Sequence, residues 1–181
     1  TPNLFTDFGG KLSNIGFEIK LNYVNYSVSS ENVKNNLGLI DKTTKNATLT
    51  NVNATIVGLS NSTSNYLALN GIPNKPLYFG GIVGENNGKI EYTLSTLTGV
   101  DLSATVKGDY LFFGGLVGVN NGTIVGYTAE DETSSGGQKV VFTSYVANQG
   151  AIANVNISAS GFANGAIGGV VGLNKGNLSN A

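Results

Sequence analysis

Few residues in this chain have side chains suited to catalysis. The 181 residues include no His and no Cys, and only 11 Asp plus Glu. This excludes an imidazole base, a thiol nucleophile and a zinc site built on His or Cys. A carboxylate pair of the kind used in glycoside hydrolysis remains open among the scattered acids. Candidates are Glu85, Glu91, Asp101 and Asp109, none with a distinguishing context. We therefore predict a protein that is not an enzyme, with no catalytic, cofactor-binding or metal-binding residue.

Charge is equally sparse. The net charge is −1, and all ten basic residues are Lys, so neither nucleic acid nor an anionic membrane is an expected partner. The glycine-rich run Gly84–Lys89 is one residue short of a phosphate-binding loop, and Ile90 stands where Ser or Thr would bind magnesium. The acidic run Glu130–Glu132 is interpreted as a solvated loop tip, with a calcium site as the alternative.

Asparagine is the residue type most open to modification. Seven Asn-x-Ser/Thr sequons are present, at Asn25, Asn46, Asn53, Asn61, Asn121, Asn156 and Asn177. N-linked glycans are expected on several of them if an archaeal or eukaryotic cell exports the protein. Asn46, Asn53 and Asn61 are favoured because their surroundings are loop-like, whereas Asn121 lies in a tight turn.

A twelve-residue motif recurs three times and organises the chain. Residues 79–90 return as residues 113–124 and again as residues 167–178. The shared form is apolar, Gly-Gly, aliphatic-Val-Gly, any residue, Asn, any residue, Gly, any residue, aliphatic. The aliphatic residues predict short buried strands, and the paired glycines predict a close approach of another backbone. The Asn and Gly predict a tight turn, because both tolerate positive φ, so each copy is expected to be strand, turn, strand.

These three segments resemble the GLUG repeat of large bacterial and archaeal surface proteins. The resemblance covers about 36 of the 181 residues and is carried by the Gly-Gly-aliphatic-Val-Gly and Asn-x-Gly elements. It implies a cell-surface setting without catalysis. The copies are 34 and then 54 residues apart, so regular solenoid rungs would require insertions.

The rest of the chain also reads as short strands. Residues 15–23 alternate apolar and polar for nine positions, which predicts a strand with one buried face. Turn signals recur about every ten residues, which favours an all-β sandwich or barrel, with a short parallel β-solenoid as the alternative. Residues 60–76 and 129–138 are expected to be loops. One all-β domain is predicted over residues 11–181, with a possible subdivision near 60–76.

The first ten residues are treated separately. Leu4, Phe5 and Phe8 precede Gly9 and Gly10, which suggests a short strand on a glycine hinge. Such a strand could complete the sheet of a neighbouring subunit. The alternative is a degenerate first copy of the motif inside the fold.

Two functions follow from these features. The first is a structural subunit of an extracellular filament, in which copies join head to tail by strand exchange. The second is a fragment of a large surface adhesin that contacts glycans or proteins of other cells. Both place the protein outside the cell or at its surface. The longest apolar stretch, near residues 110–119, is half a membrane span, so no membrane-spanning segment is expected.

Overall fold

The computed structural model describes residues 3–21, 23–26, 36–58, 66–69, 75–91, 93–98, 101–135, 138–146, 149–153 and 156–179. Within these ranges the chain forms strands and turns and no helix, so the all-β expectation is confirmed. The strands are β1 (Lys11–Leu21), β2 (Tyr23–Tyr26), β3 (Asn36–Leu37), β4 (Ile40–Lys42), β5 (Thr48–Gly58), β6 (Tyr66–Leu69), β7 (Leu77–Gly80), β8 (Val83–Asn86), β9 (Lys89–Glu91), β10 (Leu94–Thr98), β11 (Asp101–Gly114), β12 (Val117–Asn120), β13 (Thr123–Val125), β14 (Tyr127–Ser135), β15 (Gln138–Val146), β16 (Gln149–Ala153), β17 (Asn156–Gly168), β18 (Val171–Asn174) and β19 (Asn177–Ser179).

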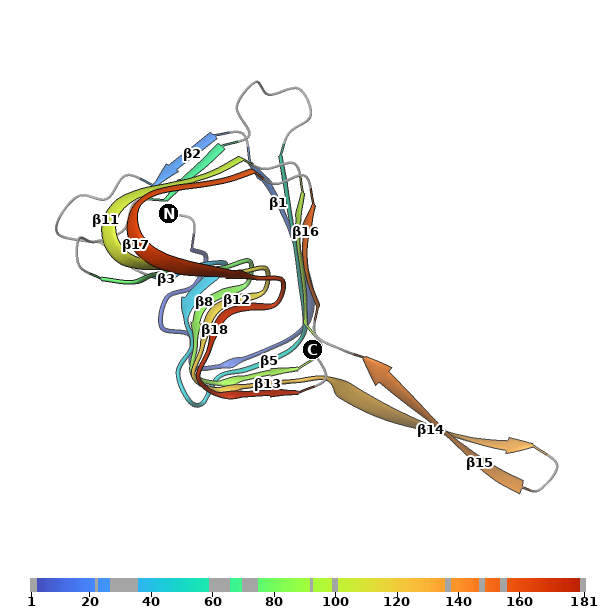
Figure 1. Ribbon diagram of the computed structural model, residues 1–181. Helices are drawn as coiled ribbons and strands as arrows, with labels where there is room; N and C mark the ends of the chain where they lie inside the picture. Colours follow the sequence, from blue (N-terminus) through green and yellow to red (C-terminus); the bar gives the residue numbers. More distant parts are fainter. Residues whose placement is uncertain are drawn as a thin grey trace.

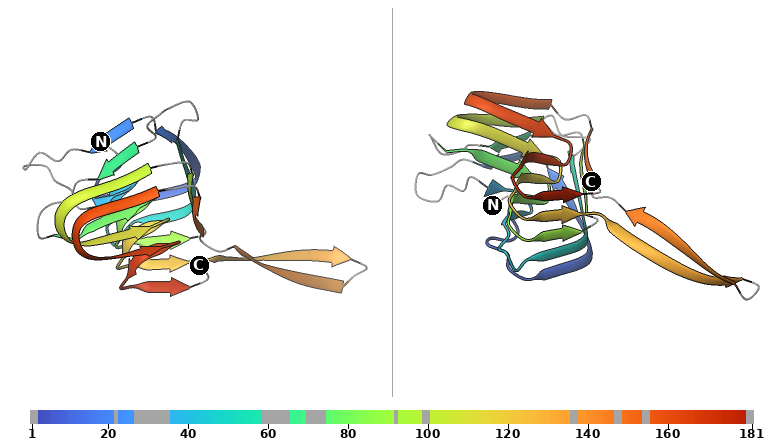
Figure 2. Two further views of the ribbon diagram at one scale, coloured as in Figure 1. Left: turned by 45° about the horizontal axis from the view of Figure 1, so that its top comes forward. Right: turned by 60° about the horizontal axis from the view of Figure 1, so that its bottom comes forward.

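Successive passes of the chain lie on top of one another as rungs. We number them as rung 1 (residues 3–21), rung 2 (23–58), rung 3 (66–98), rung 4 (101–153) and rung 5 (156–179). Figure 1 looks roughly along the stack, so that β8, β12 and β18 nearly superimpose, and the side views of Figure 2 show the rungs one above another.

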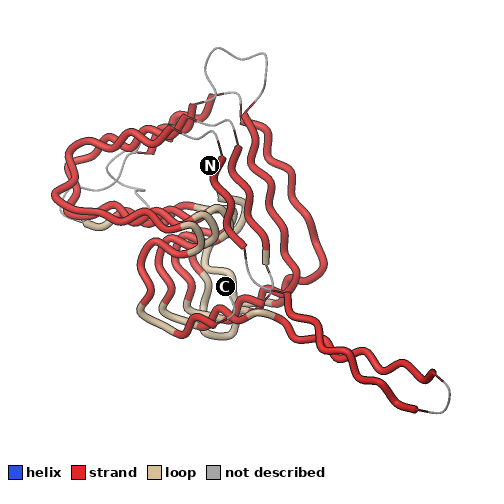
Figure 3. The backbone as a smooth tube through the Cα atoms, turned by 45° about the vertical axis from the view of Figure 1, so that its right-hand side comes forward, coloured by secondary structure: helices blue, strands red, loops and turns tan. Residues whose placement is uncertain are grey.

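Three parallel sheets form the walls of the stack. One runs in the order β18-β12-β8-β4, a second contains β2, β3, β6, β7, β11 and β17, and the third contains β1, β5, β9, β10, β13, β16 and β19. Short turns join these walls at the corners, which are tan in Figure 3. Every rung-to-rung pairing in the described chain is parallel, so the arrangement is the solenoid alternative rather than the expected sandwich or barrel.

An inserted hairpin explains the uneven spacing of the motif. The three copies are in register, with Val117 paired to Val83 on one side and to Val171 on the other. The 54-residue spacing exceeds the 34-residue spacing by 20 residues, the length of the segment Tyr127–Val146 that forms β14 and β15. These two strands pair with each other in antiparallel fashion and project away from the stack (Figure 1).

The hairpin corrects one loop assignment. Residues 129–138 were expected to be a loop with Glu130–Glu132 at its tip, yet Glu130, Asp131 and Glu132 lie within β14 opposite Thr143, Phe142 and Val141. The acidic residues hid the strand because Asp and Glu have low β propensity, whereas strand pairing with β15 overrides that preference. Part of the other predicted loop, residues 66–69, is also a strand, paired with β2 and β11.

The aliphatic residues of the motif form the core. Ile82, Val83 and Ile90 of the first copy are fully buried, as are their equivalents Leu116, Val117 and Ile124 in the second. The leading Phe79 and Phe113 stack with ring centroids 4.8 Å apart and planes inclined by 7°. Burying such columns removes apolar surface from water in every rung, which stabilises the stack one neighbour at a time.

Rung 1 is only half covered, because it lies at one end of the stack. Of the predicted alternation at residues 15–23, Phe17 packs against the core, but Ile15 is 37% exposed. The strand was therefore predicted correctly, but its apolar face is only partly buried, because a neighbouring rung covers rung 1 on one side only.

Candidate functional site: an asparagine ladder

The asparagines of the three motif copies form a hydrogen-bonded column through the stack. Asn86 Nδ2 donates to Asn120 Oδ1 at 2.8 Å, and Asn120 Nδ2 donates to Asn174 Oδ1 at 2.8 Å. At the rung 2 end, Thr43 Oγ1 donates to Asn86 Oδ1 at 2.8 Å. We call these four residues the asparagine ladder. Thr43, Asn86 and Asn120 have no exposed surface, whereas Asn174, in the last rung, is exposed.

Each ladder asparagine also closes its own corner turn. Asn86 Oδ1 accepts from the Gly88 backbone N–H at 3.2 Å, and Asn86 Nδ2 lies 3.3 Å from Gly88 O. Asn120 and Asn174 donate in the same way to Gly122 O and Gly176 O. A buried carboxamide needs partners for two donors and its acceptor oxygen, and this geometry supplies them along and across the stack.

The turn asparagines therefore differ from their predicted role. They were predicted as turn residues because Asn tolerates positive φ, but the non-glycine residues with positive φ in the described chain are Asp7, Asn14 and Asn51. Asn14 and Asn51 occupy equivalent corners of rungs 1 and 2, where Asn51 Nδ2 donates to Asn14 Oδ1 at 3.0 Å. In the motif, Asn therefore contributes side-chain hydrogen bonds. At Asn14 and Asn51, it contributes both a side-chain hydrogen bond and a backbone conformation with positive φ.

The expected close approach at the motif glycines is confirmed. A Cβ on Gly118 would lie 2.7 Å from Gly84 O and 2.7 Å from the Phe79 backbone N. A Cβ on Gly172 would meet the Phe113 backbone N at 2.8 Å in the same way. The sheet containing β8, β12 and β18 thus packs directly on the backbone of β7 and β11, and no side chain larger than hydrogen fits between them.

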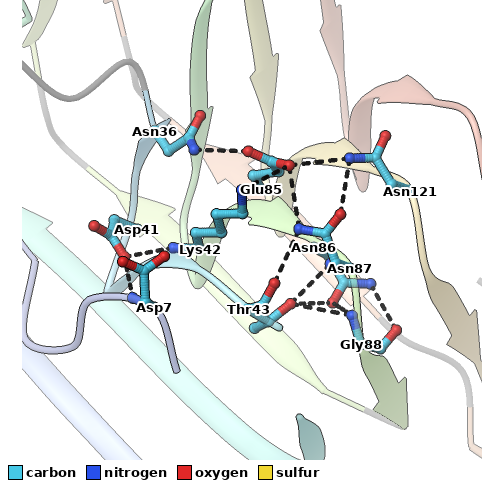
Figure 4. A network of polar contacts seen from close by, with 10 residues as sticks. All are labelled: Asp7, Asn36, Asp41, Lys42, Thr43, Glu85, Asn86, Asn87, Gly88 and Asn121. Carbon is cyan, nitrogen blue, oxygen red and sulfur yellow. Dashed lines mark hydrogen bonds and ion pairs between the residues drawn. The ribbon is translucent and has the colours of Figure 1, made fainter. Parts of the chain in front are cut away.

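A polar cluster around Glu85 lies beside Thr43 and Asn86 of the ladder (Figure 4). Glu85 Oε2 accepts from Asn36 Nδ2 at 2.8 Å, and Oε1 lies 3.6 Å from Lys42 Nζ. Glu85 Oε1 also accepts from Asn87 Nδ2 at 3.1 Å and from Asn121 Nδ2 at 3.2 Å. These contacts join rungs 2, 3 and 4, so the carboxylate ties three rungs together.

Two titratable groups are shifted by such contacts. Burial, and then the charge of Glu85, raise the pKa of Tyr78 above its ordinary value. The hydrogen bond from Lys89 is the main cause that lowers the pKa of Glu91, assisted by the Thr50 hydroxyl and opposed by partial burial.

The four acids considered as catalytic candidates occupy different surroundings. Glu85 belongs to the polar cluster, and Glu91 forms an ion pair with Lys89 and accepts from Thr50 Oγ1. Asp101 and Asp109 are positions in β11, a different strand. Among the residues that the structure describes, no three acidic side chains gather in a way that could hold a metal ion.

The sequons fall in several environments. Asn46 is exposed in a turn, and Asn121 and Asn177 are exposed at the stack surface. Asn53, expected in a loop-like stretch, lies half-buried within β5. Asn25 and Asn156 are positions in β2 and β17, and Asn61 lies outside the described residues. Glycosylation at these positions stays a prediction.

The N-terminal residues lie against their own chain. Phe5 pairs with Ile40 and Phe8 with Thr43, both in parallel bridges. Their rings are 5.5 Å apart and pack against the core, Leu4 is exposed, and β1 begins directly after Gly9 and Gly10. In this subunit, residues 3–10 therefore form part of rung 1, and the register places Phe8 opposite Thr43, at the ladder position rather than at the leading aromatic position of the motif.

Comparison of the chain with known protein families, characterised proteins and solved structures found no match. The resemblance to the GLUG repeat accordingly rests on the motif residues alone. No helix among the described residues is long and apolar enough to cross a membrane.

Sequence reasoning missed the ladder as a site. The available signal was the recurrence of Asn at one motif position, 86, 120 and 174, followed two residues later by Gly. Stacking identical amides at the 4.8 Å spacing of neighbouring strands is the geometry in which each Asn can donate to the next. The site is thus suited to binding one rung of polypeptide to another.

Proposed function

We propose that this protein is a structural subunit of an extracellular filament on a cell surface, in which copies join head to tail through β-strand pairing. The asparagine ladder is the observation that carries the proposal. A stack held together by the same contacts between neighbouring rungs can be lengthened by adding further rungs. Such an arrangement suits a protein that forms long filaments.

Composition supports the same proposal. Only 12% of the residues are charged, so few interactions depend on the pH or salt of the surroundings. The exposed sequon residues Asn46, Asn121 and Asn177 are available to the glycosylation machinery of an exporting cell. Residues 3–10 are one candidate for the donated strand, since they already pair with a neighbouring rung through backbone hydrogen bonds.

Immunogold electron microscopy of intact cells that express the gene tests this function. Antibodies against the folded chain should label filaments outside the cell, and protease added to intact cells should remove the label. Label confined to the cell interior would refute the proposal. The mass of the native material, read in hexose-sized steps above 18.6 kDa, reports on the proposed glycans.

The projecting hairpin favours a second candidate, an adhesive segment of a larger surface protein. Insertions between the repeats of a stack lie on its surface, where they commonly form binding elements. Cells that express a parent protein lacking residues 127–146 should display it at normal levels but adhere less to their target surface. Unchanged adherence with normal display would rule this role out for the hairpin.

A further inference from the structure

The two ends of the stack carry most of its exposed apolar side chains. Of the five large hydrophobic residues exposed in the described chain, four lie in the end rungs: Leu4 and Ile15 in rung 1, and Ile167 and Leu178 in rung 5. Ile167 is 61% exposed, although Phe79 and Phe113 at the equivalent motif position are 4% and 1% exposed. Position in the stack, rather than residue type, therefore causes this exposure.

The open edge of rung 5 also ends the ladder. Asn86 and Asn120 both donate to a glycine carbonyl in their own turn and to the asparagine of the next rung, and Asn120 Nδ2 also donates to Asn177 O at 3.2 Å. Asn174 donates to Gly176 O at 3.1 Å, and no further rung among the described residues stands where its second amide hydrogen would point. A strand edge of this kind is a template for pairing with another chain.

We infer that rung 1 of a second copy stacks in parallel on the open edge of rung 5, which deepens the proposed filament function by naming the two surfaces that meet. Continuity of the side-chain columns supports this partner. Leu12, Leu49, Ile90, Ile124 and Leu178 form one column from rung 1 to rung 5. The Leu12 of the next copy would follow Leu178 and continue an unbroken aliphatic column.

A second column of equivalent side chains would also continue into the stacked copy. Phe5, Ile40, Val83, Val117 and Val171 are equivalent positions in the five rungs, so a stacked copy would place Phe5 after Val171. At the ladder position rung 1 carries Phe8, whose ring would cover Asn174 and accept a weak N–H···π contact. Phe8 occupies the equivalent place beside Thr43 within the subunit.

Charge favours this pairing over a symmetric one. Lys175 is the only charged residue between Gly165 and Ser179, so two rung 5 edges would bring like charges together. Rung 1 instead presents Asp7 and Lys11, each two residues from the position equivalent to Lys175, so its two charges there balance and add no net repulsion. The net charge of −1 adds little repulsion between copies.

Sedimentation of end-blocked variants tests the inference. Leu178→Lys places a charge on the rung 5 edge, and Leu4→Lys places one on rung 1, at the position equivalent to Val170. The matched control is Tyr110→Lys, because Tyr110 is 42% exposed like Leu178 but lies in rung 4, away from both ends. The weight-average mass of the wild type and of Tyr110→Lys should rise with protein concentration, and each end-blocked variant should lose this rise.

Mixing the two blocked variants decides the geometry. Leu178→Lys keeps a free rung 1 and Leu4→Lys keeps a free rung 5, so an equimolar mixture should reach twice the monomer mass and no more. The complex should dissociate on dilution, because no strand has to leave its own subunit. Circular dichroism confirms that each variant is folded.

Three outcomes would overturn the inference. Association of Leu4→Lys alone would indicate contact between two rung 5 edges. A complex that resists dilution would indicate exchange of residues 3–10. A wild-type chain that stays monomeric at every concentration would mean that some other polypeptide covers the edge. None of these results bears on surface location, which the microscopy experiment tests independently.

Discussion

Asn120 is the residue at which the stability of the stack depends most on one side chain. Its carboxamide is fully buried and links Asn86 to Asn174. Asn120→Leu would leave one N–H of the Asn86 amide without its acceptor and Asn174 Oδ1 without its donor, so the free energy of unfolding should fall by about 3 kcal/mol. The matched substitution Asn174→Leu, at the exposed end of the ladder, should cost less than about 1 kcal/mol. Urea denaturation of both variants checks this, and equal losses would show that the ladder contributes nothing beyond its individual turns.

The raised pKa of Tyr78 leads to a prediction about stability at alkaline pH. Its pKa is raised by burial and by Glu85, so the folded state holds the phenol proton more tightly than the unfolded state does. The associated stability is full below the unfolded pKa, near 10, and is lost as pH rises through the folded pKa. Tyr78→Phe should therefore lose stability less steeply than the wild type above about pH 10. Thermal melts across this range test the prediction, and parallel curves for the two proteins would contradict it.

At the scale of the element, the glycine of each central motif strand determines how closely two sheets pack. Gly118→Ala would drive a Cβ into the backbone of Gly84 and Phe79, neither of which can yield as a flexible side chain could. We expect a loss of more than about 3 kcal/mol, or failure to fold. Gly16→Ala is the control, because a Cβ there meets nothing within 4 Å and its φ lies outside the left-handed region. It should be neutral or stabilise by up to about 1 kcal/mol. A well-folded Gly118→Ala variant would mean that the two sheets can move apart.

The hairpin is the element that should be dispensable for folding. β14 and β15 pair only with each other among the described strands. Deleting residues 127–146 leaves three residues between β13 and β16, against the two between β9 and β10 in the preceding rung. The shortened chain should keep the β-type circular dichroism spectrum and a melting temperature close to that of the parent. Loss of the cooperative melt would show that the hairpin supports the stack.

At the scale of the whole molecule, protection from hydrogen exchange should follow position in the stack. The backbone N–H groups of Ile82 and Val83 both reach Leu116 O, and those of Leu116 and Val117 both reach Val170 O. Val170 and Val171 are the equivalent residues of rung 5, beyond which the described chain has no rung. In dilute solution their amides should exchange much faster than those of the other two copies, because opening the last rung breaks the fewest contacts. Equal protection in all three copies would contradict an open edge at rung 5.

The main features of each motif copy can be predicted from the sequence alone. The all-β character, the buried aliphatic residues of the motif and the close backbone approach at its glycines follow from local pattern, because strand alternation and steric exclusion act within a few residues. The sequence also indicated the strand at residues 15–23, of which residues 15–21 belong to β1. What it could not supply was the partner of each strand.

Tertiary structure decided everything that depends on register between distant segments. The 54-residue spacing argued against regular solenoid rungs. In the structure, residues 127–146 form a hairpin outside the stack, which accounts for the extra residues between the second and third motif copies. The acidic strand β14 was predicted to be a loop because its own residues do not reveal the pairing with β15 that stabilises it. Asn86, Asn120 and Asn174 looked like turn residues, yet they meet 34 and 54 residues apart because parallel stacking places identical positions one strand spacing from each other. Whether a motif residue is buried or exposed, as with Phe113 and Ile167, depends on whether another rung follows, and the motif itself does not encode that.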